Sequence, residues 1–293
     1  MIVYATGKAV EIALMENGKL TEIHKQKATD NFTVGDVFWG KIKRINAPLN
    51  AAFVDIGHKK DAFLHYTDLG PKVRTLQKWA SLASNGRLKA KGIDNFRPEK
   101  EIVKTGRIDQ VFERRQNILA QVLKEPISTK GPRLSCEITL PGRFLVITPF
   151  SDVVAVSKKI STSEERKRLK LIVDSIRPKN FGVIVRTAAE GRNTAELLEE
   201  VNNLVGKWNT IKEQLKTGKP PIKLLSEIDK TSSLLRDLLT DNFNRIVIDD
   251  KDLYERVKNY LQGIAPDKVR LLQLHKSNRP IFDVCGVTKQ IKS

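Results

Sequence analysis

The chain has 293 residues, of which 40% are apolar and 6% aromatic. At roughly 100–200 residues per domain, this length predicts two or three domains. Apolar and charged residues are interleaved throughout, which excludes the composition of a disordered chain. Lys and Arg outnumber Asp and Glu by 52 to 34, giving a net charge of +18. Such an excess attracts polyanions and favours nucleic acid as a partner, although charge alone leaves contacts with ribosomes or anionic lipid open.

The sequence predicts no membrane partner. It contains no run of about 18 apolar residues, and its start, MIVYATGKAVEIALMENG, carries charges too early for the apolar core of a signal peptide. We therefore expect a cytoplasmic protein. Cys136 and Cys285 are the only cysteines, too few for a zinc site or a disulfide framework, and each lies in an apolar context that predicts a buried thiol.

Two β-rich regions open the chain. The run VEIALMENGKLTEIH alternates apolar and polar residues around Asn17-Gly18, which tolerates the positive φ of a tight hairpin turn, so residues 1–33 predict a strand pair. Residues 34–140 contain short alternating strands with glycine turns, which favours a small barrel. Within them, residues 71–100 carry eight Lys or Arg against two acidic residues, together with several turn formers. We expect a basic, partly mobile insertion there.

Residues 141–222 predict a unit of strands and helices. The strands GRFLVITP and DVVAVSKKI precede a helix that Ser163 caps and a proline ends. The buried strand FGVIVRTAA follows. A long amphipathic helix comes next, in which Leu197, Leu198 and the later apolar residues up to Leu215 are expected to face one way.

The segment TGKPPIK, residues 217–223, predicts a linker at a domain boundary. Residues 223–293 then show the order helix, strand, helix, strand, which favours a mixed sheet covered by helices. The N-terminal hairpin is expected to supply the strands that this sheet lacks. The predicted elements are a helix at 232–239, the strand RIVID, a helix at 252–262 and the strand KVRLLQLH. No turn, cap or charged tail closes IFDVCGVTKQIKS, so we expect the natural protein to continue.

Aromatic and basic residues gather in the barrel region. Phe53 and Phe63 lie on neighbouring predicted strands beside Lys41, Lys43 and His65. Bases stack on aromatic faces for about 1–3 kcal/mol each while cations neutralise phosphates, so this mixture suits single-stranded nucleic acid. The residues alone leave an alternative open, because most strand phenylalanines are buried in a core.

Longer motifs carry a family resemblance. The run GKIKRINAPLNAAFVDIGHKKDAFLHYTDLG resembles the S1-type OB-fold of the ribonuclease E/G family. TKGPRLSCEITLPGRFLVITP and FGVIVRTAAEG are similar to the family's 5′-sensor domain, and RIVIDDKDLYERV and HKSNRPIFDVCGVTKQI to its RNase H-like subdomain. The resemblance implies a multidomain α+β fold. An RNase H-like subdomain is split between 1–33 and 223–293, with an S1-type OB-fold barrel at 34–140 and an α/β 5′-sensor domain at 141–222 inserted.

The resemblance also implies roles for residues. Phe53 and Phe63 take base-stacking positions, and Lys130 takes a position that contacts the RNA backbone on the same surface. This assignment agrees with the stacking chemistry inferred from the residues themselves.

A second set of residues is implied at the 5′ end of the RNA. Arg186 and Thr187 match the pair that grips a 5′-terminal monophosphate, and Gly142 and Val146 match positions that shape the pocket. These residue types suit a phosphate. The guanidinium of Arg and the hydroxyl of Thr can donate hydrogen bonds to it, and a glycine lets the backbone approach it closely. Where the family often has arginines, this chain has lysines, among them Lys158. A lysine supplies positive charge but cannot form the two parallel hydrogen bonds of a guanidinium. Without the resemblance, Arg186 is better explained as a strand-end surface arginine in an ion pair.

The family's reaction is hydrolysis of single-stranded RNA in RNA processing and decay, by a Mg²⁺-activated water in a DNase I-like domain. The resemblance places its two metal-binding aspartates after Ser293, and so implies no catalytic residue, metal ligand or bound cofactor in this chain. Asp249, Asp250 and Asp252 are local candidates for Mg²⁺, yet carboxylates before a helix also cap it.

The implied partner is single-stranded RNA, preferably 5′-monophosphorylated, and a homo-oligomer of the full-length protein is compatible with the resemblance. A non-catalytic single-stranded RNA-binding module is the alternative function. Continuation of the reading frame into a segment with two separated aspartates near apolar strands would favour the nuclease.

Overall fold

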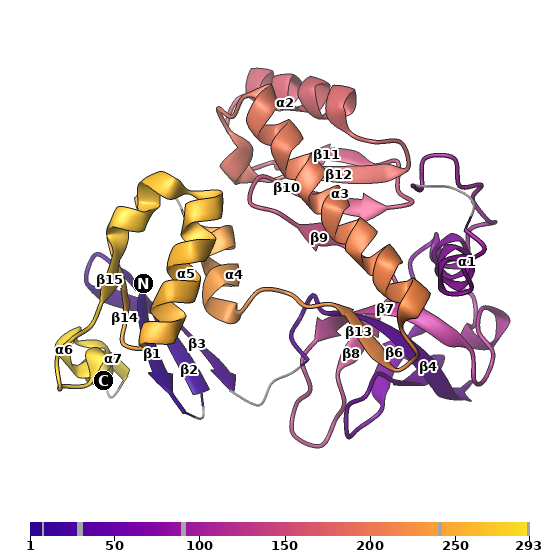
Figure 1. Cartoon of the computed structure of the whole chain (residues 1–293), viewed down its shortest axis with the longest axis horizontal. Helices are drawn as coiled ribbons and strands as arrows, with labels where there is room; N and C mark the ends of the chain where they lie inside the picture. Colours follow the sequence, from indigo (N-terminus) through magenta and orange to yellow (C-terminus); the bar gives the residue numbers. More distant parts are fainter. Residues whose placement is uncertain (8, 28–31, 89–91, 240–241, 292–293) are drawn as a thin grey trace. The chain divides into compact units, whose positions relative to one another are not determined.

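The computed structural model describes residues 1–7, 9–27, 32–88, 92–239 and 242–291. They form two compact units, one made of Met1–Asn31 with Ile228–Ser293 and the other of Phe32–Glu227 (Figure 1). Each unit contains both helices and strands, which confirms the prediction of an α+β fold.

The first unit is built on a five-stranded sheet in the order β15-β14-β1-β2-β3. β1 pairs in parallel with β14 and antiparallel with β2, so the predicted mixed sheet, completed by the N-terminal hairpin, is confirmed. Asn17 and Gly18 form the hairpin turn with φ of 50° and 78°, as their tolerance of positive φ predicts. The strands are β1 (Ile2–Thr6), β2 (Ala9–Glu16), β3 (Lys19–Lys27), β14 (Ile246–Ile248) and β15 (Leu272–Leu274).

Helices cover both faces of this sheet. α4 (Lys230–Leu238) and α5 (Lys251–Ile264) pack their apolar residues on one face. α6 (Ile281–Val284) and α7 (Val287–Ile291) close a smaller core on the other. The predicted last strand is shorter than expected, because its first half is a 3-10 helix, η4 (Pro266–Leu271), which a proline begins.

In the second unit, five strands close into a barrel, which confirms the predicted barrel. The strands run in the order β4-β5-β6-β8-β7, and pairing of β4 with β7 closes the ring. Gly40 permits the close packing inside, since a Cβ there would lie 2.8 Å from the backbone oxygen of Asp55. The barrel elements are β4 (Val37–Asn46), β5 (Ala51–Asp55), β6 (Ala62–His65), β7 (Asn117–Lys124), β8 (Arg133–Ser135) and the 3-10 turns η1 (Tyr66–Asp68) and η2 (Ile108–Gln110).

The prediction of a linker at 217–223 is wrong for its last two residues, which lie in a strand. β13 (Ile222–Leu225) pairs antiparallel with β4 and so extends the barrel sheet. Lys223 also donates a hydrogen bond to the buried carboxylate of Asp36, over 2.6 Å.

The basic insertion at 71–100 contains a helix that the sequence analysis did not predict. α1 (Val73–Ser84) packs against β7 and α3, and the indole of Trp79 stacks on that of Trp208 with centroids 4.4 Å apart. The high Lys and Arg content of the insertion made the apolar face of α1 hard to recognise in the sequence. Three residues of this insertion, 89–91, lie outside the described residues.

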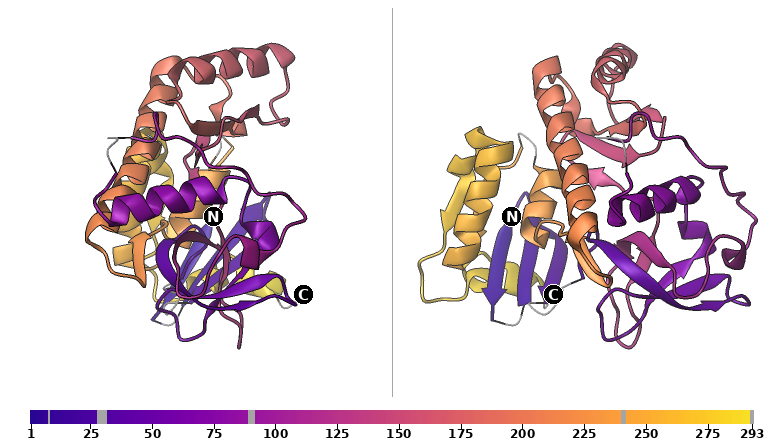
Figure 2. Two further views of the ribbon diagram at one scale, coloured as in Figure 1. Left: turned by 90° about the vertical axis from the view of Figure 1, so that its right-hand side faces the viewer. Right: turned by 45° about the vertical axis from the view of Figure 1, so that its right-hand side comes forward.

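A four-stranded sheet in the order β11-β12-β10-β9 completes the second unit. Its strands are β9 (Leu140–Pro141), β10 (Leu145–Pro149), β11 (Val154–Val156) and β12 (Phe181–Val185). Two helices pack on it, α2 (Ser163–Ile176) and the long α3 (Thr194–Thr217), which extends from this sheet to α1 (Figure 2). The N-cap of α2 is Thr162 and not Ser163, since the Thr162 hydroxyl accepts from the backbone of Glu165.

Helix α3 has a narrower apolar stripe than the sequence predicted. Leu197 and Leu215 are buried as expected, whereas Leu198 is 40% exposed. One residue turns a helix by about 100°, which carries Leu198 away from the stripe. The buried members are Leu197, Val201, Leu204, Trp208, Ile211 and Leu215.

The two cysteines differ. Cys136 is buried as predicted, and burial raises the pKa of its thiol, whereas Cys285 is only half-buried. Among the described residues, no helix combines the length and apolar character needed to cross a membrane.

The two leucines on α3 give a matched test of this packing. Leu204→Ala is expected to lower the free energy of unfolding by about 2–5 kcal/mol, because Leu204 is buried and its truncation leaves a cavity. Leu198→Ala, on the exposed side, is expected to change it by less than about 1 kcal/mol. Urea unfolding measures both, and equal losses would show that the stripe is misplaced.

Candidate nucleic-acid interface

An aromatic row lies on the outer face of the barrel. Phe53 on β5 and Phe63 on β6 are directly paired across the strands, with ring centroids 5.7 Å apart at 70°. His65 continues the row, with its ring 6.3 Å from that of Phe63. Strand alternation explains this placement, because their neighbours Ala52 and Leu64 point into the core. Both phenylalanines are half-buried and lie outside the buried core of the barrel.

The two phenylalanine rings face a cavity of about 810 Å³. Apolar side chains from Leu49 and Ile127, which are 52% and 70% exposed, add to its wall. Basic residues also line this cavity, and Lys130, which the sequence predicted on this surface, is among them. The basic residues of the lining are Arg44, Lys60, Lys124, Lys130 and Arg133.

Arg44 is a member of this surface that the sequence did not predict. Its guanidinium carbon lies 3.8 Å from the centroid of the Phe53 ring, a cation–π contact. Regular alternation would place Arg44 on the opposite face from Lys43. The register of β4 with β5 shifts between Ile42 and Arg44, and such a bulge leaves both basic side chains exposed.

The other predicted lysines lie outside this cavity lining. Lys43 donates a hydrogen bond of 2.7 Å to Asp61, which raises the pKa of the lysine. Lys41 is exposed on the same strand. Of the cavity's own cations, Arg133 is held by both carboxylate oxygens of Asp68, at 2.7 and 3.1 Å, and this contact raises the pKa of Arg133.

The second group of predicted residues meets at one edge of the four-stranded sheet. β11 and β12 are parallel, so the residues that follow them emerge at the same edge. Ser157 and Lys158 follow β11, and Arg186 and Thr187 follow β12. The hydroxyls of Ser157 and Thr187 lie 3.0 Å apart, and Lys158 is exposed.

Gly142 and Val146 are brought to the same edge by β9 and β10. The guanidinium of Arg186 donates a hydrogen bond of 2.8 Å to the carbonyl oxygen of Gly142. Val146 is paired with Ile184, one of the last residues of β12, and Ile184 is 44% exposed. The sequence did not single out Ile184, because a continuous apolar strand gives no sign of which residue stays exposed.

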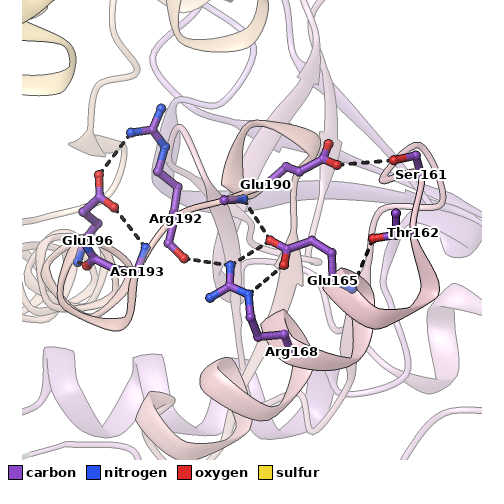
Figure 3. A network of polar contacts seen from close by, with 9 residues as sticks. Ser161, Thr162, Glu165, Arg168, Glu190, Arg192, Asn193 and Glu196 are labelled. Carbon is purple, nitrogen blue, oxygen red and sulfur yellow. Dashed lines mark hydrogen bonds and ion pairs between the residues drawn. The ribbon is translucent and has the colours of Figure 1, made fainter.

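A polar network holds the segment that follows Thr187 (Figure 3). The carboxylate of Glu165 accepts two hydrogen bonds of 2.7 Å from Arg168 and one of 2.8 Å from the backbone of Gly191. Arg168 also donates to the carbonyl oxygen of Arg192 over 2.9 Å. α2 is thereby tied to the segment that leads from the Arg186 edge into α3.

The start of α3 is fixed by a capping box. Asn193 accepts from the backbone of Glu196, whose side chain accepts in return from the backbone of Asn193, both over 3.0 Å. Arg192 adds an ion pair of 3.1 Å to Glu196 (Figure 3). The α3 end of the segment between β12 and α3 is therefore anchored.

The acidic residues near residue 250 have structural partners. Asp250 is the N-cap of α5 and accepts from the backbone of Leu253 over 2.7 Å, and Asp249 accepts from the backbone of Ala5, also over 2.7 Å. Burial raises the pKa of Asp249. Within the described part of the chain, no three or more His, Cys, Asp or Glu side chains are grouped to hold a metal ion.

A closed barrel with partly exposed aromatic rings beside basic residues has the chemistry of a protein that binds single-stranded nucleic acid. Comparison with known proteins agrees with this class. The model of the Ribonuclease E/G family matches residues 139–293. The chain is 33% identical to ribonuclease G of Haemophilus influenzae over 293 residues, and 30% identical to ribonuclease G of Escherichia coli over 292. The chain belongs to the ribonuclease E/G family.

These relatives are longer than the chain. Each ribonuclease G alignment covers 100% of this chain but 56% of the relative, so the chain spans about half the length of these proteins. A ribonuclease E of Nostoc sp. is 32% identical over 270 residues, which is 90% of this chain and 35% of that protein.

The network around Glu165 predicts a pH-dependent contribution to stability. Hydrogen bonds from Arg168, and then from the backbone of Gly191, lower the pKa of Glu165 from 4.5 to about 2. Because the folded-state pKa is depressed, this contribution is present above about pH 4.5 and is lost as pH falls towards 2. Glu165→Gln is therefore expected to melt earlier than the unaltered chain at pH 7, with the difference shrinking below pH 4.5. A constant difference in melting temperature from pH 7 to pH 3 would contradict this assignment.

Proposed function

We propose that this chain is the RNA-binding and 5′-monophosphate-sensing portion of an endoribonuclease that cleaves single-stranded RNA in RNA processing and decay. The observation that carries the proposal is the Phe53–Phe63 pair facing a cation-rimmed cavity in a chain of this family. The barrel is proposed as the S1-type RNA-binding domain, and the four-stranded sheet as the 5′ sensor. The five-stranded unit is proposed as the RNase H-like subdomain.

The proposed barrel site binds RNA without reading its sequence. A base can stack on an aromatic ring whatever its identity, and the ribose can contact the apolar side chains of Leu49 and Ile127. Lys130, Lys60 and Lys124 surround these groups and would neutralise phosphates. Arg44 already covers one face of Phe53, so an incoming base has the remaining ring surface, or displaces the guanidinium.

The proposed sensor site binds the 5′-monophosphate at the edge where β11 and β12 end. Arg186 supplies a guanidinium whose position is fixed by the Gly142 carbonyl, and the Thr187 hydroxyl adds a neutral donor. Lys158 adds charge at the same edge. Val146 and Ile184 offer an apolar surface beside these groups for the first nucleotide.

Cleavage is proposed to reside outside these 293 residues, in a part of the protein that holds Mg²⁺ to activate water. The residues of this chain would bind and orient the RNA. A cytoplasmic location and assembly of the full-length protein into a homo-oligomer belong to the same proposal.

The barrel site is tested by truncating its rings. Phe53→Ala and Phe63→Ala are each expected to weaken binding of single-stranded RNA by about 1–3 kcal/mol, because each removes a stacking surface. Fluorescence anisotropy with a labelled oligonucleotide measures the loss, and the affinity should also fall steeply with salt because bound phosphates release counterions. A drop of about 3–5 kcal/mol in stability with unchanged affinity per folded molecule would show instead that the rings serve packing.

The sensor site is tested by comparing two RNAs that differ only at the 5′ end. The monophosphate is expected to bind roughly tenfold or more tightly than the hydroxyl, and Arg186→Ala to remove most of that preference, since a hydrogen bond to a charged group contributes about 1.5–3 kcal/mol. Lys170→Ala, an exposed cation on α2, is the matched control for loss of positive charge. Equal weakening of both RNAs by Arg186→Ala would refute phosphate recognition at this edge.

A further inference from the structure

The carboxylate of Glu200 lies against the loop that joins β9 to β10. Glu200 is on α3, one turn after the capping box, and its side chain is partly buried beneath this loop. One oxygen accepts from the backbone N–H groups of Arg143 at 2.7 Å and Phe144 at 3.1 Å. The other accepts from Phe144 at 2.9 Å and Leu145 at 2.7 Å. Three consecutive backbone donors therefore converge on one side chain.

Convergent backbone N–H groups of this kind form an anion-binding nest. Here the anion is supplied from within the chain, so the nest is filled by Glu200. Gly142 makes the contact possible, since a Cβ at this position would lie 2.6 Å from the carboxyl carbon of Glu200. Glycine at 142 is therefore explained by the internal carboxylate, independently of any bound RNA.

The filled nest also sets the position of Arg186. The loop that Glu200 holds carries the Gly142 carbonyl, and this carbonyl accepts the 2.8 Å hydrogen bond from Arg186. The backbone N–H of Arg186 in turn donates to the carbonyl of Phe144, over 2.7 Å. The backbone N–H and the guanidinium of Arg186 are thus both hydrogen-bonded to the loop that Glu200 holds.

Glu200 is better suited to this role than a neutral side chain. An ionised carboxylate only accepts hydrogen bonds, whereas the amide of Gln would place two donors against a row of donors. Burial raises the pKa of Glu200 above its ordinary value, and the three N–H groups and Arg186 oppose this effect only in part. The three backbone N–H groups therefore offset part of the desolvation cost of this carboxylate.

We infer that Glu200 is a positioning residue for 5′-phosphate recognition: it fills the loop's anion nest and thereby fixes Arg186, so that the phosphate is bound by side chains at the sheet edge and not by the loop's backbone. This inference rests on the sensor role proposed above. It assigns Glu200 no contact with RNA.

The test compares Glu200→Gln with Glu199→Gln, which removes the neighbouring, exposed carboxylate on the same helix. The probes are one single-stranded RNA oligonucleotide with a 5′-monophosphate and the same oligonucleotide with a 5′-hydroxyl. Glu200→Gln is expected to reduce the roughly tenfold monophosphate preference by about threefold, because Arg186 is kept but loses its fixed position. Glu199→Gln is expected to keep the preference and both affinities.

Gly142→Ala disturbs the same contact from the side of the loop. It is the second test variant, to be used if Glu200→Gln does not fold. Its Cβ displaces the carboxylate, so the preference should fall in the same way. An unchanged preference in a folded variant of either kind overturns the inference, and so does equal weakening of both RNAs, which marks a general structural role. Tighter binding of the monophosphate by Glu200→Gln also overturns it, because the nest would then be the phosphate site that Glu200 blocks. Absence of any preference in the unaltered chain overturns the proposed sensor itself.

Discussion

Burial of one stripe on α3 is the constraint on which the second unit depends. Six side chains of this helix are buried, from Leu197 near its start to Leu215 near its end. Each contributes on the order of 1.5–3 kcal/mol when removed from water. The first half of the helix packs on the four-stranded sheet and carries Glu200 to the β9–β10 loop. In the second half, Trp208 stacks on Trp79 of α1, and the helix then leads into β13 on the barrel. A single packed helix therefore connects the elements that carry both proposed sites.

Strand geometry then decides which side chains are presented. On the barrel, alternation turns Phe53 and Phe63 outward, and one bulge adds Arg44 to their side. On the four-stranded sheet, parallel pairing of β11 and β12 brings their following residues to one edge. Neither site requires a strained conformation at its key residues. The net charge of +18 would then raise the local concentration of RNA around both sites.

Much of the fold could be predicted from the sequence because its local signals agree with its tertiary contacts. The Asn17-Gly18 turn, the alternating barrel strands and the order of the last elements all specify their neighbours through short-range geometry. The mixed sheet with the N-terminal hairpin followed from the need to bury the apolar faces of an incomplete set of strands. Phe53, Phe63 and Arg186 were singled out by motif; strand alternation turns the two phenylalanines outward, and the parallel pairing of β11 with β12 brings Arg186 to the sheet edge.

The sequence predictions are incomplete or wrong where a contact between residues distant in sequence determines the local structure and the local composition does not. The helix α1 within the insertion at 71–100 was not predicted from its charges and turn formers, because the stacking of Trp79 on Trp208 of α3 is a contact between residues distant in sequence. The segment at 217–223 has the composition of a linker, and only pairing with β4 turns its end into a strand. Arg44 and Glu200 were missed for the same reason. A β-bulge depends on two strands together, and a nest depends on a loop and a helix distant in sequence.

We propose that one strand of RNA is held by the barrel while its 5′ end lies at the edge of the four-stranded sheet. Photo-crosslinking with 4-thiouridine tests it most directly, with the label placed either at the first nucleotide or within a 5′-monophosphorylated strand, and with the crosslinked peptides identified by mass spectrometry. A label at the first nucleotide should crosslink within residues 142–146 or 184–187, and an internal label within 49–63 or 124–133. Crosslinks from both labels that fall mainly in the basic insertion at 71–100, or in the unit built on the five-stranded sheet, would contradict the account.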